Sequence, residues 1–135
     1  MSIRFSDIGG NTILNAVYVQ TSITAQINTR YLVNTTGNEV AINLPDEPNV
    51  GDQVEIIDAV GDGSSSGGEG FGKNACIINP PTGFKIQGIE NSLVLDIDGT
   101  TVSLIFDGAD SWIYYILNVN KYDQNFLEDT DDVPE

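Results

Sequence analysis

The residues with the clearest chemical potential form a glycine-rich segment, residues 67–74, which reads Gly-Gly-Glu-Gly-Phe-Gly-Lys-Asn. Its glycines and Lys73 have the spacing of a nucleotide-binding phosphate loop, in which backbone amides and a lysine bind the phosphates. However, Asn74 replaces the serine or threonine that binds magnesium there, and Glu69 opposes a phosphate. The following residues predict a strand and then prolines, not a phosphate-binding helix N-terminus. We therefore interpret the segment as a mobile loop.

A second candidate is the run Asp96, Ile97, Asp98 and Gly99, which is similar to the start of a calcium-binding loop. Such a loop needs a further acidic residue and then a bidentate glutamate at fixed spacings. Here the chain enters a predicted strand at Thr100 instead. We expect a hairpin turn at this point, with adventitious calcium binding as the alternative.

Adjacent carboxylates could support hydrolysis. Asp46 with Glu47, and Asp131 with Asp132, are such pairs. A glycosidase needs two carboxylates that face each other across a cleft, one of them with a raised pKa. In a chain this acidic, solvated turns are the simpler interpretation of neighbouring acids. A small carboxylate hydrolase would need a deep pocket, and nothing in the sequence requires one.

The chain contains no histidine, and this removes Ser-His-Asp and Cys-His catalytic systems and histidine-bound zinc. Cys76 is the single cysteine and lies in the apolar run 75–78, so we expect a buried thiol. We predict that the protein is not an enzyme, has no catalytic, cofactor-binding or metal-binding residues and uses no cofactor.

The aromatic residues near the end of the chain could stack on sugars. On an alternating strand, Trp112 and Tyr114 share one face, and Ile113 and Tyr115 share the other. One of these two sets is expected to pack in the core. Core and interface packing is therefore the preferred interpretation, and sugar stacking is the alternative.

The elements that would position these residues are short strands. The runs are rich in β-branched or aromatic residues and are separated by Gly, Pro, Asn or Asp. They cover residues 13–19, 23–27, 31–34, 40–44, 54–59, 75–79, 84–87, 93–97, 102–106 and 112–117. The dipeptides at 98–99 and 107–108 are strong turn signals. The sequence predicts an all-β fold, either a β-sandwich or a small open β-barrel of about 8–10 short strands.

Charge limits the possible partners. The net charge is −15, with only five Lys and Arg residues among the 135. Binding to nucleic acid or to an anionic membrane needs clustered cations, so both are excluded as expected partners. The N-terminus has no apolar signal segment, and no run approaches the length of a membrane span. Synthesis in the cytoplasm is expected.

The chain divides into three parts on composition: an N-terminal arm with the first strands at 1–27, a β module at 28–119, and an acidic tail at 120–135. The apolar residues near the start of the arm include Ile3, Phe5, Ile8, Ile13 and Leu14. The tail holds six acids but also four apolar residues, Tyr122, Phe126, Leu127 and Val133. The tail is expected either to be solvated or to dock on a neighbouring subunit or partner.

A set of motifs between about residues 28 and 117 resembles a β module found in virion proteins of tailed bacteriophages, in tail fibres and in capsid decoration proteins. The matching positions are Tyr31, Val33 and Thr35; Ile42, Leu44 and Pro45; Gly51, Asp52 and Val54; Ile57 and Asp58; Phe71, Asn74, Ile77 and Asn79; Ile86 and Gly88; Leu93 and Leu95; Val102, Leu104 and Phe106; and Gly108 with Trp112. The insertion at residues 61–72 is longer than the connection expected at this place in the module.

The resemblance implies a non-catalytic, homotrimeric structural protein located in the virion. The chain is short, begins with Met1 and has its own arm and tail, which favours a free-standing protein over a fibre fragment. We therefore expect a capsid cement or decoration protein on the outer surface of the head. It would dock on the major capsid protein and stabilise the expanded head. The alternative is a tail-fibre or tail-tip module, in contact with other tail proteins or with host surface glycans.

Overall fold

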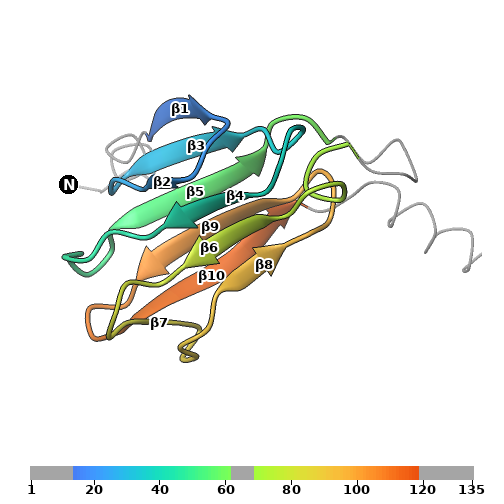
Figure 1. The fold of residues 1–135 in the computed structure, drawn as a ribbon. Coiled ribbons are helices and arrows are strands. Elements are labelled where there is room, and N and C mark those ends of the chain that lie inside the picture. The colour runs from blue at the N-terminus through green and yellow to red at the C-terminus, as the bar shows by residue number, and fades with distance from the viewer. Residues whose placement is uncertain (1–13, 62–68, 119–135) are drawn as a thin grey trace, which may run out of the picture.

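The computed structural model describes residues 14–61 and 69–118, which form two β-sheets stacked face to face (Figure 1). The large sheet contains, in spatial order, β1 (Asn15–Val19), β3 (Thr29–Val33), β5 (Gln53–Asp58), β9 (Thr101–Phe106), β10 (Ser111–Asn118) and β7 (Lys85–Ile86). The small sheet contains β2 (Ile23–Thr24), β4 (Val40–Asn43), β6 (Cys76–Asn79) and β8 (Leu93–Leu95). The predicted all-β fold is confirmed, and of its two forms the structure is the sandwich.

The chain crosses between the sheets after every strand from β1 to β8, and only the β9–β10 connection stays within one sheet. Because of this alternation, β1, β3 and β5 run parallel in the large sheet, and β2, β4 and β6 run parallel in the small sheet. β8 and β9 then pair antiparallel with β6 and β5. Strands β1 to β6 thus wind around a common core. The later strands complete this core.

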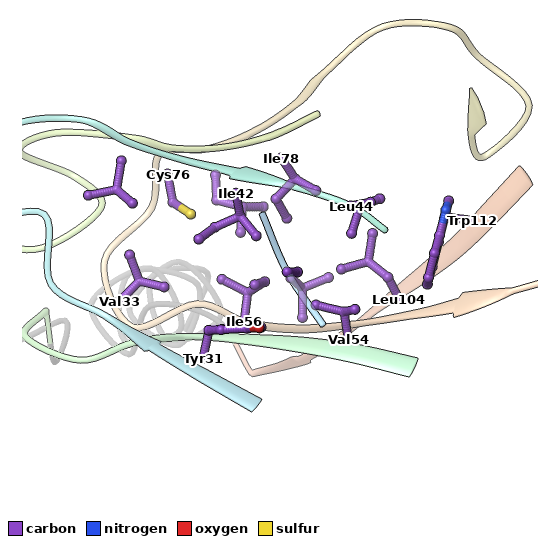
Figure 2. Packing of buried hydrophobic residues seen from close by; sticks show 14 of the residues in the cluster. Tyr31, Val33, Ile42, Leu44, Val54, Ile56, Cys76, Ile78, Leu104 and Trp112 are labelled. Atoms are coloured by element: carbon purple, nitrogen blue, oxygen red, sulfur yellow. The ribbon is translucent and has the colours of Figure 1, made fainter. Parts of the chain in front are cut away.

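The core lies between the two sheets and is formed by alternate residues of their strands (Figure 2). In β3, for example, Tyr31 and Val33 are buried while Arg30 and Leu32 are not, which is the period of two that a half-buried strand requires. The fully buried side chains include Val33, Val40, Ile42, Val54, Ile56, Cys76, Ile78, Val102, Leu104 and Trp112. At one end of the core, the ring centroid of Phe106 lies 5.5 Å from that of Phe84 and 5.4 Å from that of Trp112.

All ten predicted strands are present, with ends that differ by up to a few residues. The turn at Asp107 and Gly108 joins β9 to β10 as a hairpin, and Gly108 has a φ of +91°. The hairpin predicted at Asp98 and Gly99 is wrong, because β8 and β9 lie in different sheets. No helix among the described residues has the length and apolar character needed to cross a membrane.

The predicted N-terminal part also contributes to the sheets. β1 pairs with β3 over its whole length, from Asn15 with Thr29 to Val19 with Val33. β2 pairs with β4 through Ile23 and Thr24. The apolar residues at positions 3, 5, 8 and 13 and those of the tail lie outside the described residues.

Candidate functional site

The glycine-rich segment does cradle an anion, but the anion is a carboxylate of the same chain. Asp98, in the β8–β9 connection, is 2% exposed. It accepts hydrogen bonds from the backbone amides of Glu69 (2.9 Å), Gly70 (3.0 Å) and Gly72 (2.7 Å). Successive amides of this kind form the concavity with which a phosphate loop binds phosphate. Here the Asp98 carboxylate already uses these donors, so the amides are not free for a nucleotide.

Asp58, at the end of β5, completes the attachment of the same loop. It is 8% exposed and accepts hydrogen bonds from the amides of Gly61 (2.9 Å), Phe71 (2.9 Å) and Gly99 (3.0 Å). The amide of Val60 also donates to it, over 3.0 Å. Hydrogen bonds from backbone amides are how a buried carboxylate offsets the cost of leaving water.

The interpretation of the segment as a mobile loop is wrong for residues 69–72, which are attached to the fold. Phe71 is 1% exposed and belongs to the core. A Cβ at Gly61 would lie 2.5 Å from Asp58 Oδ2, and one at Gly72 would lie 2.9 Å from Asp98 Oδ1. The glycines are therefore needed so that the backbone can approach the carboxylates. Residues 62–68 lie outside the described residues.

Asn74, which stands where a phosphate loop has its magnesium ligand, has a structural contact instead. Its Nδ2 donates to the carbonyl oxygens of Thr35 (2.8 Å) and Thr36 (3.2 Å), in the turn after β3. Lys73 is exposed to solvent. The resemblance of this segment to a nucleotide site thus comes only from the spacing of its glycines and Lys73.

The other acidic candidates among the described residues lie in two different connections of the fold. Asp46 and Glu47 are exposed in the connection after β4, as predicted for a solvated turn, whereas Asp131 and Asp132 lie outside the described residues. Asp96 is exposed, and Asp98 is buried under the loop. Within residues 14–61 and 69–118, no three Asp, Glu, Cys or His side chains are placed to hold a metal ion.

Cys76 is completely buried on β6, which confirms the prediction of a buried thiol. Burial raises the pKa of this thiol to about 12, and the negative charge of Asp58 adds to the increase. Only the thiolate is a nucleophile, so Cys76 is an inert core residue at neutral pH.

Among the aromatic residues, Trp112 is fully buried, Tyr114 packs partly against the core, and Tyr115 is 46% exposed. This division confirms that the two faces of β10 differ as alternation predicts. Trp112 cannot stack on a sugar, because no part of it reaches solvent.

β10 carries four exposed large hydrophobic side chains, more than any other strand in the described part of the chain. Its outer face shows Ile113, Tyr115 and Leu117, and Ile116 is exposed on the inner face. None of the residues from Ser111 to Asn118 is charged, although the chain has a net charge of −15. A continuous apolar strand of this kind is typical of an interaction site. We take the outer face of β10, with Ile113, Tyr115 and Leu117, as the candidate interaction surface.

Sequence reasoning located the strand and its two faces but did not find the paired roles of Asp58 and Asp98. A signal was present: each acid lies close to the end of a predicted strand, and a glycine follows it within three residues. Comparison of the sequence with models of protein families gives no match, and comparison with curated proteins gives none either.

Proposed function

We propose that the protein is a non-catalytic structural protein of a tailed-bacteriophage virion, and specifically a capsid cement or decoration protein. The observation that carries the proposal is the place of the resemblance residues in the fold. Val54, Leu104 and Trp112 are fully buried between the sheets, and Gly51 adopts a φ of +87° in the turn before β5. Many of the motif positions that resemble the phage module are thus core or turn positions of the two-sheet fold.

The arrangement of charged groups also supports a structural role. Asp58 and Asp98 are occupied by backbone amides, and the Arg30 side chain pairs with Glu55 on the outer face of the large sheet. Lys85 pairs with Asp110 over 3.2 Å. These groups hold the scaffold in place and do not converge on a pocket where they could act on a substrate.

The proposed mechanism is stabilisation by selective binding. A homotrimer docks on the major capsid protein at the outer surface of the head and binds only the expanded arrangement of the shell. A ligand that binds one state alone stabilises that state by mass action, in proportion to the logarithm of its concentration over its Kd. The uncharged surface of β10 supports this, because it allows an acidic protein to make a contact without bringing like charges together.

The test is binding of the purified protein to purified heads. We expect cosedimentation with expanded heads and none with unexpanded heads. Tyr115→Lys should weaken this binding at least about tenfold, because a charge would be buried in the contact. Val50→Lys is the matched control, since Val50 is 72% exposed and lies outside the apolar face of β10, beside Gly108 in the β9–β10 turn. Equal binding to both kinds of head, or to neither, would end the proposal.

A further inference from the structure

One long side of the sandwich is open, because the large sheet extends beyond the small one. β8 ends the small sheet, whereas β10 and β7 lie beyond β9 in the large sheet. As a result, residues on one inner face of β10 differ greatly in burial. Trp112 is fully buried, Tyr114 is partly buried, and Ile116 is 54% exposed. An inward-facing isoleucine with this exposure lacks the covering element that the rest of the core has.

The open side forms an apolar groove between β8 and β10. One hollow of about 190 Å³ is lined by Leu93, Leu95, Ile97, Tyr114 and Ile116, among others. A second hollow of about 280 Å³ shares Leu93 and Tyr114 with the first and continues it towards Ile86 and Ile89. We call the two together the β8–β10 groove. It has the shape of a site for one extended chain.

Along this groove, on the edge of β10 opposite β9, no strand among the described residues pairs with β10 beyond Trp112. β7 pairs only with Ser111 and Trp112, and the Gln87 amide donates to the carbonyl of Trp112 over 2.8 Å. Two residues further along β10, the Tyr114 amide donates a hydrogen bond to Oε1 of Gln87, over 3.1 Å. Amides alternate in direction along a strand, so the Ile116 amide points to the same open side. Beyond Gln87 the edge is ready to pair with another strand.

We propose that residues 122–127 of the same chain fill the β8–β10 groove as an additional strand paired with β10. The described chain leaves β10 at Asn118, and the Asn118 side chain contacts the carbonyl of Gly99, beside the groove end at Ile97. A short turn after Asn118 would reverse the chain along the edge. Six extended residues span about 20 Å, enough to cover β10 back to Tyr114.

The composition of residues 122–127 favours this segment over the rest of the tail as the occupant of the groove, and the position of β1 argues against the N-terminal segment. Tyr122, Phe126 and Leu127 are apolar, and Asp123 is the only charged residue between 122 and 127, because five of the tail's six acids follow Leu127. Lys121 would lie near Asp96, an exposed acid at the groove. The N-terminal segment instead enters the fold at β1, four strand spacings or about 19 Å from β10.

The test compares full-length variants by amide hydrogen exchange at low protein concentration. In the parent protein the Ile116 amide should be protected. The double variant Phe126→Ser with Leu127→Ser should exchange there at least about tenfold faster, while core amides such as Val102 keep their rates. Val133→Ser is the matched control and should leave the Ile116 rate unchanged.

Unchanged exchange at Ile116 in the double variant would overturn the proposal. Protection that appears only as the protein concentration rises would also overturn it, since a second copy would then be the occupant. Neither outcome involves capsids, so this result and the failure of the proposed function can be told apart.

Discussion

Asp58 and Asp98 hold the glycine-rich loop between them, and the amide of Gly99, next to Asp98, donates a hydrogen bond to Asp58 over 3.0 Å. Asp58 ends a strand of the large sheet, and Asp98 follows a strand of the small sheet. The loop is therefore a cross-link between the sheets at one end of the sandwich. This explains how residues 69–72, two of which are glycines, adopt a defined structure.

Replacing Asp98 should reduce stability. In Asp98→Asn the side chain loses its charge, and its amide nitrogen would face one of the backbone donors that now bind the carboxylate. We expect the free energy of unfolding to fall by about 2–4 kcal/mol in urea titrations. Asp46→Asn, at an exposed acid, should change it by less than about 0.5 kcal/mol. Equal effects of the two substitutions would contradict the buried role of Asp98.

Gly70 should not accept a side chain. A Cβ at this position would overlap the carboxylate oxygens of Asp58, so the loop or the carboxylate must move. Gly70→Ala should cost about 1–3 kcal/mol of unfolding free energy, as overpacking does in other cores. The control is Gly37→Ala, where no atom lies within 4 Å of the added methyl group. If Gly70→Ala were as stable as the control, the loop would not be held as described.

The two faces of β10 should respond differently to truncation. Trp112→Ala removes a fully buried side chain and should cost about 3–5 kcal/mol. Tyr115→Ala removes an exposed one and should cost less than about 1 kcal/mol. Both changes in unfolding free energy should be measured by circular dichroism during urea unfolding. Tryptophan fluorescence cannot serve for the first variant, because Trp112 is the only tryptophan. A large loss of stability in Tyr115→Ala would place that side chain in the core instead.

The β9–β10 turn should make a small contribution to stability that disappears in acid. Hydrogen bonds from the backbone amides of Ala109 and Ser111 lower the pKa of the Asp107 carboxyl from its ordinary value of 3.8. The folded state thus favours the ionised form. The stabilisation is present above pH 3.8 and is lost as the pH falls through the lower pKa of the folded state.

Two measurements check this expectation. A side-chain carboxyl titration by NMR should give a midpoint for Asp107 below 3.8. Asp107→Asn should remove the corresponding part of the acid-induced loss of stability. A midpoint at or above the ordinary value would show that the turn hydrogen bonds do not form in solution.

The strands could be predicted from the sequence because their signal is local. Alternation such as that of Val40 and Ile42 with their polar neighbours fixes a strand and its buried face within a few residues. The pairing could not be predicted in this way. β3 pairs with β5 across a separation of about 25 residues, and short turns such as that at Gly99 are compatible either with a hairpin or with a crossing to the other sheet.

The role of the glycine-rich loop also could not be predicted from its local sequence. Its glycines fit a bound phosphate and a bound carboxylate equally well, because both use the same amides. The carboxylates that decide between them lie on Asp58 and Asp98, on either side of the loop in the sequence. Only the fold brings the three segments together.

The most direct test of the central claim is the location of the protein on the virion. Electron micrographs of purified phage particles, labelled with gold-conjugated antibody against this chain, would give it in one measurement. The proposed function predicts gold over the surface of the head. Gold confined to the tail, or particles that carry no label, would contradict it.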